Sequence, residues 1–405
     1  MASPTFVVQV YLDGSLRALT ADVRAIKINV GRSRVQDVFK AGTCRISLNN
    51  QTNAYSPLGG GTYGDSQWIN AEVRVNVFLN SASQPTTLFR GKIDDLDVLF
   101  PDATDSTVVL KCSDGLSTLS KTELNNVTFA EQVGSARFTA ILNNAQVDYP
   151  NSSNPVDRAV DTSTIDMAGE TVAGLQTATY TARLAQSEDG AIYCSHGIPG
   201  GAAAASTKRG NVMTYKKRYA SSTPTGLTFI GSGGNDTQPP MTALKTTYGS
   251  ELLYTRGVYA GSTGTDQVYE ENVFGTPAYG VRTTVRRNLL NLNDADVLTA
   301  CKNFVALHST PALRVTQLTC LPRSMTEAQA EKVAKLGIWD GIQVSFTPVG
   351  ADTAQQRIVR IEGVTHDITP MKWTMQINTS GSGDQQFFIL DSTIDGILSI
   401  NKLAP

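Results

Sequence analysis

Three closely spaced aspartates are the residues of this chain best placed for acid–base or cation chemistry. Asp94, Asp95 and Asp97 lie within one β-rich run, and a pair of carboxylates can cleave a glycosidic bond. Successive side chains of a strand point to opposite faces, so Asp95 and Asp97 should share a face and Asp94 should point away. This arrangement favours a solvated acidic stripe over a catalytic pair.

The histidines and cysteines do not form a second candidate catalytic or metal-binding set. His196, His308 and His366 are expected on a loop, a helix end and a strand, without the spacing of a metal site. The helix dipole favours His308 at a helix C-terminus, and His366 is expected to position a turn. The cysteines are far apart, odd in number and never in a C-x-x-C arrangement, which predicts buried reduced thiols; they are Cys44, Cys112, Cys194, Cys301 and Cys320. We therefore predict no catalytic, cofactor-binding or metal-binding residues, and no enzyme activity.

Two other motifs are better explained by structural roles than by ligand binding. The run Asn291 to Asp296 resembles a calcium loop but lacks the glycine and terminal glutamate of an EF-hand, so helix capping explains it better. Basic residues are concentrated in one segment of the chain, which also contains Tyr215 and Tyr219 and could contact nucleic acid. A solvated hairpin or a subunit contact is the favoured interpretation; its basic residues are Lys208, Arg209, Lys216, Lys217 and Arg218.

Composition bounds the class of protein. The chain has 405 residues, of which 40% are hydrophobic and 17% charged, with a formal net charge of -2. This length predicts two to three packed units, and the charge excludes the basic footprint of a sequence-reading nucleic-acid binder. We expect no signal peptide and no transmembrane segment, and hence folding in a cytoplasm.

Hydrophobic periodicity divides the chain into three parts. Residues 1–125 and 281–405 alternate apolar and polar side chains in short runs separated by turns, which predicts strands. Residues 126–280 mix helices and strands. We expect helices after a Ser135 cap, over Val172–Ser187 with Gly190 as its stop, and after an Asn293 cap. The predicted fold class is mainly β, with an inserted α+β domain between two β-domains.

A strand-turn-strand pattern occurs twice. Leu88–Pro101 is followed by Ser106–Gly115, and Arg357–Pro370 is followed by Met371–Gly381. In both copies a β-rich run carries an early glycine, Gly91 or Gly363, and ends at a proline. The repeat predicts two related β-units around a different middle.

Several short motifs follow one another along nearly the whole chain. They are Gly31-Arg32, Phe39 to Asn50, Tyr55-Ser56-Pro57, Phe89-Arg90-Gly91 with Asp114-Gly115, Tyr149-Pro150 with Arg158 and Asp161, Glu188-Asp189-Gly190, Tyr279 to Arg282, His366 to Thr374, and Phe388 to Leu398. In this order they resemble the minor tail or tail-tip (baseplate) hub proteins of bacteriophages with long non-contractile tails. The chain departs from that pattern at Gly197–Gly210, where it carries an extra loop, and around the second helix, which is short.

The resemblance implies a homotrimer in which two tail-tube-like β-barrels per chain make a six-fold pseudo-symmetric ring at the virion tail tip. Implied partners are the distal tail or tail tube ring protein, the tape measure protein and tip or central fibre proteins, with transient passage of phage DNA and no sequence-specific nucleic acid binding. The acidic stripe would then face the lumen and repel phosphates. A receptor- or glycan-binding module around Tyr248–Tyr269 is the alternative, and a peptidoglycan hydrolase is disfavoured because no catalytic set is found.

Overall fold

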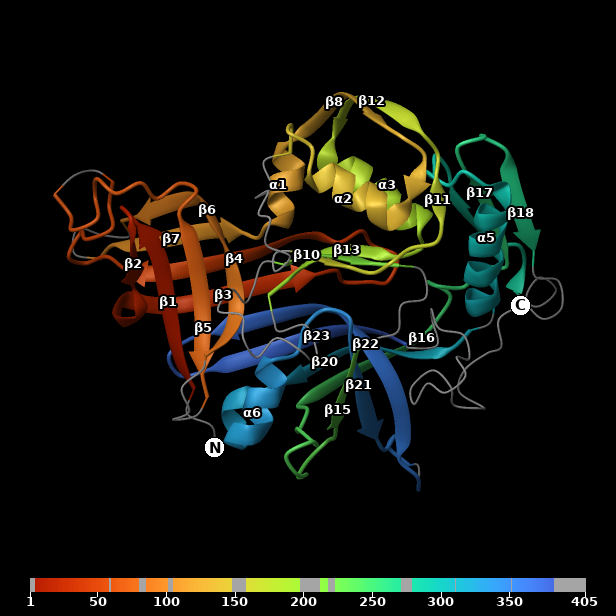
Figure 1. Cartoon of the computed structure of the whole chain (residues 1–405). Coiled ribbons are helices and arrows are strands. Elements are labelled where there is room, and N and C mark those ends of the chain that lie inside the picture. The colour runs from red at the N-terminus through yellow and green to blue at the C-terminus, as the bar shows by residue number, and fades with distance from the viewer. Residues whose placement is uncertain are drawn as a thin grey trace.

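The structure is a computed structural model of the whole chain (Figure 1). It describes residues 4–57, 60–79, 85–100, 105–147, 158–196, 212–217, 223–270, 279–309, 311–350 and 352–381. The predicted Gly197–Gly210 loop, Tyr149-Pro150 and the Phe388 to Leu398 motif lie outside the described residues.

A 13-stranded sheet runs through the molecule and confirms the mainly β class. Its order is β16-β20-β23-β22-β3-β4-β7-β6-β5-β1-β2, with β15 and β21 on a branch from β22. The first-half strands are β1 (Thr5–Leu12), β2 (Ser15–Ala18), β3 (Val23–Gly31), β4 (Lys40–Asn49), β5 (Glu72–Phe78), β6 (Thr86–Leu99) and β7 (Thr107–Ser113). The others are β15 (Thr223–Phe229), β16 (Ala243–Tyr248), β20 (Leu313–Cys320), β21 (Asp340–Phe346), β22 (Gln355–Ile368) and β23 (Trp373–Gly381). Among the described strands the pairing does not close into a ring, since β2 and β16 end it.

The strand order is duplicated. The first β-unit follows β1-β5-β6-β7-β4-β3, and the second follows β15-β21-β22-β23-β20-β16. Every neighbouring pair is antiparallel except β15–β21, which is parallel. Matching cross-strand rows of apolar residues fix the equivalence: Ile26–Ile46–Leu110–Leu96 in the first unit and Leu244–Leu318–Ile377–Val364 in the second.

The two glycines that suggested the repeat are not equivalent, although the repeat itself exists. The ladder of β6 with β7 is irregular between Ile93 and Asp95, and that of β22 with β23 is irregular between Ile361 and Gly363. The counterpart of Gly363 is therefore Asp95. Gly91 lies earlier, where an added Cβ would sit 2.2 Å from the Ser113 carbonyl oxygen.

The inserted middle unit packs helices against short strands above the sheet (Figure 1). It contains α1 (Leu116–Lys121), β8 (Glu123–Phe129), β9 (Gln132–Val133), α2 (Gly134–Leu142), β10 (Arg158–Val160), β11 (Asp166–Met167), β12 (Glu170–Gln176), α3 (Thr177–Ser187), β13 (Ala191–Ser195) and β14 (Val212–Lys216). Phe138 stacks on Tyr215, with ring centroids 5.3 Å apart. Both are fully buried, so this unit has an apolar core of its own.

A small lobe is inserted in the second β-unit. It consists of β17 (Arg256–Ala260), β18 (Asp266–Glu270), β19 (Thr283–Arg286) and α5 (Asp294–His308), packed around Tyr259 and Cys301. The strands β15 and β16, which lie in the predicted middle range 126–280, belong to the sheet of the second β-unit. The sequence-predicted boundaries thus describe the pairing only coarsely.

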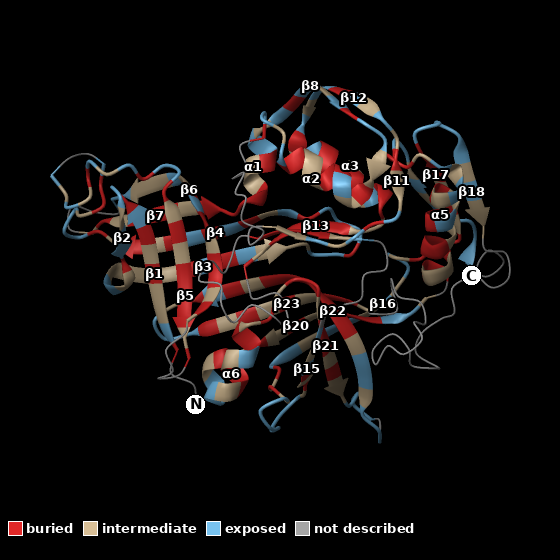
Figure 2. Ribbon diagram, viewed as in Figure 1, coloured by how far each residue is buried: buried red, intermediate tan, exposed pale blue. Residues whose placement is uncertain are grey.

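Buried and exposed residues alternate along the strands (Figure 2). In β4, Cys44, Ile46 and Leu48 are buried and the intervening side chains are not. The five cysteines are all buried and free, as predicted. Within the described residues, no helix has the length and apolar character that crossing a bilayer requires.

Three helix predictions need correction. The residue before α2 is Val133, and Ser135 lies inside the helix. Residues 172–176, predicted as the start of the second helix, belong instead to β12 (Glu170–Gln176), because its backbone pairs with that of β8. The helix α6 (Glu327–Ala334) was not expected, although its start carries a capping box of Thr326 and Gln329.

This capping box gives a testable stability effect. Thr326→Ala removes the hydroxyl that accepts from the Gln329 amide at 3.2 Å, so we expect the free energy of unfolding to fall by about 1 kcal/mol. Thr326→Ser keeps a capping oxygen and should retain most of that stability. Chemical denaturation of both variants measures the difference, and equal losses would contradict the capping role.

Candidate functional site

The two β-units meet at a buried ion cluster on β22. The Arg32 Nε donates to Glu362 Oε2 at 2.7 Å, and the Arg360 Nη2 donates to Glu362 Oε1 at 2.9 Å. The Ser380 hydroxyl donates to the same Oε1. The side chains of Glu362, Arg32 and Arg360 are 0%, 8% and 3% exposed, so two buried guanidinium groups share one buried carboxylate as counter-charge.

This cluster lies where three strands share β22. One edge of β22 pairs with β23, while its other edge pairs with β21 over residues 355–360 and with β3 over residues 363–368. Glu362 falls between the last two, and its backbone oxygen accepts from the Arg32 amide at 2.9 Å. The Gly31-Arg32 motif therefore marks the junction of the two β-units.

Close backbone approach explains the glycines at this junction. A Cβ on Gly31 would lie 2.3 Å from the Glu362 carbonyl oxygen, and one on Gly363 would lie 2.6 Å from the Arg32 carbonyl oxygen. Gly31 also has a φ of +90°, which side-chain-bearing residues rarely adopt. Any side chain at either position would push β3 away from β22.

Aromatic rings flank both guanidinium groups. The Arg360 guanidinium lies 3.9 Å from the centroid of the Trp339 ring, and that of Arg32 lies 4.4 Å from the centroid of the Phe39 ring. Burial by itself raises the pKa of Glu362, but the charges of Arg32 and Arg360 outweigh it and lower the pKa to about 2. Glu362 is consequently ionised at every physiological pH.

A second junction ties the middle unit to the first β-unit through Asp114. The Asp114 Oδ2 accepts from the Gly42 amide at 2.9 Å and lies 3.1 Å from His196 Nε2. The His196 Nδ1 accepts from the Arg90 amide at 3.3 Å, and its ring stacks on Phe89. His196 follows β13 directly and is buried, so its contacts with Asp114, Arg90 and Phe89 tie the middle unit to the first β-unit.

The predicted aspartate stripe is ion-paired. Lys111 Nζ lies 2.9 Å from Asp95 Oδ2 and 2.8 Å from Asp97 Oδ2, while Asp94 pairs with Lys121 of α1. Asp95 and Asp97 thus share a face and Asp94 points elsewhere, as the strand period predicted. Each of these three carboxylates is therefore held by an ammonium group.

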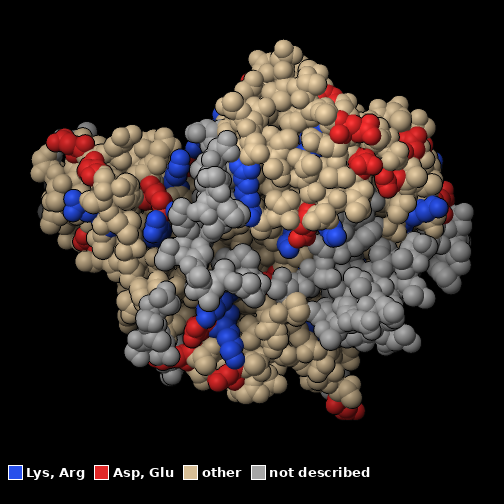
Figure 3. Space-filling model, in the orientation of Figure 1, with Lys and Arg blue, Asp and Glu red and all other residues tan. Residues whose placement is uncertain are grey.

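The sheet face that carries these aspartates has both signs of charge, which corrects the expectation of an acidic surface. A cross-strand row runs through Asp95, Lys111, Arg45, Lys27 and Asp367. Lys27, Arg45 and Asp367 are exposed. Basic and acidic side chains are likewise interspersed over the face of the molecule shown in Figure 3.

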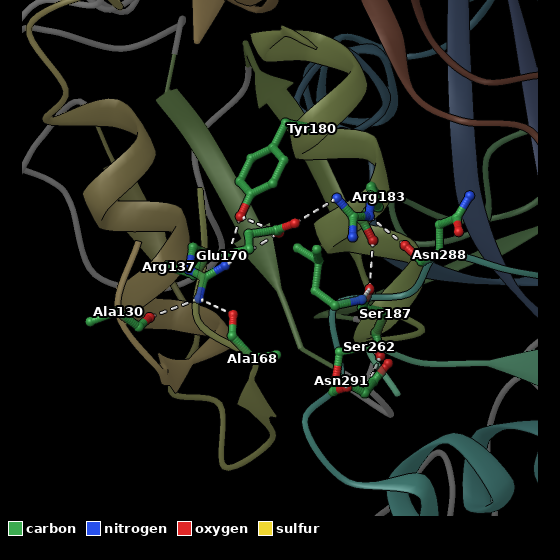
Figure 4. A network of polar contacts seen from close by, with 11 residues as sticks. Ala130, Arg137, Ala168, Glu170, Tyr180, Arg183, Ser187, Ser262, Asn288 and Asn291 are labelled. Atoms are coloured by element: carbon green, nitrogen blue, oxygen red, sulfur yellow. Dashed lines mark hydrogen bonds and ion pairs between the residues drawn. The ribbon is translucent and has the colours of Figure 1, made fainter. Parts of the chain in front are cut away.

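A polar network connects the middle unit with the small lobe (Figure 4). The fully buried Arg137 donates to the Tyr180 hydroxyl at 2.6 Å and to the Ala130 and Ala168 carbonyls, each at 2.8 Å. The Tyr180 hydroxyl donates to Glu170 at 2.9 Å. Arg183 also donates to Glu170 and reaches the backbone carbonyl of Asn288.

The same network continues into the segment before α5. The Ser187 hydroxyl accepts from the Leu290 amide at 2.7 Å, and the Asn291 side chain donates to the Ser187 carbonyl at 3.0 Å. The Ser262 hydroxyl donates to the Asn291 carbonyl at 2.8 Å. The residues that looked like a calcium loop therefore fasten the lobe, and Asn293 is the residue before α5, although its side chain makes no capping bond.

The remaining histidines have structural places. His308 ends α5 as predicted, and its Nδ1 donates to the Phe304 carbonyl at 2.7 Å. His366 lies within β22 rather than at a turn and accepts from the Trp373 indole at 3.2 Å. Burial lowers the pKa of His366 to about 4. Among the described residues, no group of three or more His, Cys, Asp and Glu could hold a metal ion.

The residues behind the two binding hypotheses differ in exposure, since Tyr248 is 69% exposed and Lys217 is exposed. Tyr259 is fully buried, and Tyr254 packs on Phe304 with ring centroids 5.7 Å apart. In the basic segment, Lys216 pairs with Asp161 at 3.5 Å. Lys208, Arg209, Arg218 and Tyr219 lie outside the described residues.

Solved structures with the same fold are phage tail proteins and a related secretion component. The tail protein from Neisseria meningitidis MC58 has a TM-score of 0.58 and 8% identity, covering 94% of this chain and 98% of that one. The 43 kDa tail protein of prophage MuSo2 from Shewanella oneidensis has a TM-score of 0.60 and 12% identity, covering 95% and 99%. The E. coli c3393 protein, a type VI secretion component described as similar to the T4 tail proteins gp27 and gp5, has a TM-score of 0.52 and 12% identity, covering 95% and 76%.

These likenesses show a shared fold across almost the whole chain. No protein-family model and no curated protein sequence matches it. The fold expected from the sequence resemblance is thereby confirmed in its coarse form, a mainly β fold that phage tail proteins share. Function is a separate question, because one fold can serve several roles.

The ion cluster predicts a particular dependence of stability on pH. Glu362 is more acidic when folded, so its stabilisation is complete above pH 4.5 and is lost as the pH falls toward 2, by about 3 kcal/mol in all. Glu362→Gln should destabilise the protein by about 3 kcal/mol at pH 7, because two buried guanidinium groups lose their counter-charge. Below pH 4.5 its stability should change less than that of the unmodified protein.

Urea unfolding across this pH range measures both effects. Glu327→Gln, at an exposed position in the first turn of α6, is the matched control and should follow the unmodified protein. Parallel pH curves for Glu362→Gln and the unmodified protein would contradict the assignment of charge to Glu362.

Proposed function

We propose that this chain is a structural virion protein of a phage tail tip, a homotrimeric hub that adapts a six-fold tail tube to a three-fold tip. The observation that carries the proposal is the duplicated β-unit, whose copies are joined edge to edge through β3 and β22. Three chains would supply six such units, so duplication within one chain absorbs the symmetry mismatch. The fold shared with phage tail proteins supports the same role.

In this hub each β-unit acts as a tube-like barrel, and the sheet face with the charged row lines the lumen. Lys27, Arg45 and Lys111 offset Asp95 and Asp367 there. A wall of balanced charge gives DNA phosphates little net attraction, which suits passage without retention. The middle unit, fixed by the Asp114–His196 junction, gates the channel or contacts the tip.

The partners follow from this position in the virion. The hub binds the distal tail or tail tube ring protein on one side and tip or central fibre proteins on the other, with the tape measure protein ending at its lumen. It has no catalytic role and no sequence-specific contact with DNA. The glycan-binding alternative is not favoured, because Tyr254 and Tyr259 are packed against α5.

Assembly state tests the proposal directly. Three chains of 43.3 kDa give a trimer of about 130 kDa, which native mass spectrometry of the full chain should detect. Image reconstruction should show a ring with six similar β-units, and labelled protein should locate to the tail tip in virions. A protein that stays monomeric at high concentration, or that lies elsewhere in the virion, would overturn the proposal.

A further inference from the structure

The strand equivalence assigns a specific pairing between copies of this chain. We propose that β16 of one copy pairs antiparallel with residues 94–99 of β6 in the next copy, reproducing the β3–β22 junction within each chain. The inference rests on the proposed ring and names the contact that would hold it.

Each strand of the first β-unit has an equivalent strand in the second. In the duplicated order, β16 occupies the place of β3, and β6 occupies the place of β22. Both β6 and β22 have 14 residues, and both pair with one neighbour along their first half and with another along their second half. The two units therefore have the same kinds of edge.

One of the two equivalent junctions, that of β22 with β3, forms within the chain. The other, which would join β6 to β16, does not form among the described residues. The β22 edge beyond Glu362 is covered by β3 through residues 363–368. The matching edge of β6, from Asp94 to Leu99, pairs with no described strand. β16 pairs only with β20 among the described strands. β6 and β16 lie on opposite sides of the molecule (Figure 1), so neither edge can satisfy the other within one copy.

Apolar side chains are exposed at the open edges of β6 and β16. At the internal junction, Ile26 lies opposite Ile368, and both are buried. Their counterparts are Leu244 on β16, which is partly buried, and Phe100 directly after β6, which is 56% exposed. Leu99 and Tyr248, also on these edges, are 47% and 69% exposed. Exposed apolar residues on unpaired strand edges mark a surface for association.

The β3–β22 junction also gives the register of the pairing between β16 and β6 of the next copy. There Asp367 lies opposite Lys27 on the solvent face. The equivalent pair between copies is Leu99 opposite Lys245, with Asp97 two residues away on the same face. An ammonium group near a carboxylate is thus retained in the copy-to-copy pairing.

A second copy of the chain is the occupant that these edges fit. The strand that already covers the equivalent edge of β22 comes from the other β-unit of the same chain. Repeating that contact from one copy to the next is heterologous, because different edges meet. It forms a closed ring where the rotation closes.

Paired cysteines test the register. Leu99→Cys combined with Lys245→Cys should give disulfide-linked dimers and trimers under mild oxidation, because directly opposite Cβ atoms lie within disulfide reach. The native cysteines are buried. Leu99→Cys combined with Val349→Cys, a fully exposed control site, should stay unlinked, as should each single variant.

A second variant tests the apolar contact. Phe100→Asp should raise the concentration at which the trimer half-dissociates by about tenfold or more, while the thermal unfolding of the monomer stays unchanged. Val349→Asp is the matched control and should leave assembly unaffected.

The outcomes separate the two proposals. A native trimer that forms with no Leu99–Lys245 cross-link and tolerates Phe100→Asp overturns this pairing and leaves the hub intact. A chain that forms no trimer overturns both. Cross-linked trimers together with loss of assembly in Phe100→Asp are the expected result.

Discussion

A buried carboxylate lies at the junction that joins the two halves of this chain. Glu362 lies where β22 changes partner from β21 to β3, and it accepts from Arg32 of one β-unit and Arg360 of the other. A strand edge cannot be shared by two strands without a break in the ladder, and the break leaves polar groups that need partners. The Arg32 amide pairs with the Glu362 carbonyl at this break, and Gly31 and Gly363 allow the close backbone approach that this bond needs.

The rest of the architecture depends on this junction. Because β3 is bound to β22, the two β-units form one continuous sheet and share one hydrophobic core. The middle unit is attached to that sheet through Asp114 and His196, and the small lobe is attached to the middle unit through Arg183 and Ser187. Buried polar contacts of this kind are costly to leave unmade, so they fix relative orientation.

The charge of a sheet face cannot be predicted from the residues of one strand. Three aspartates on one run suggested an acidic surface, yet the neighbouring strands contribute Lys111, Arg45 and Lys27 to the same face. The electrostatic character of a sheet face belongs to the row across strands, and each row gathers residues from distant parts of the chain. Likewise, Tyr259 looked available for a ligand and is instead packed beneath α5.

Local pattern was enough to predict much of the fold. Alternation of apolar and polar residues predicted the strands of residues 1–125 and 281–405, and cysteine spacing predicted reduced thiols, because these properties depend on neighbouring residues. Pairing depends on residues far apart, so the sequence could not decide that Gly363 meets Gly31 or that its counterpart is Asp95 rather than Gly91. For the same reason the extent of β12, the buried charge of Glu362 and the open edges of β6 and β16 were decided only by the tertiary structure, where strands distant in sequence compete for the same hydrogen bonds.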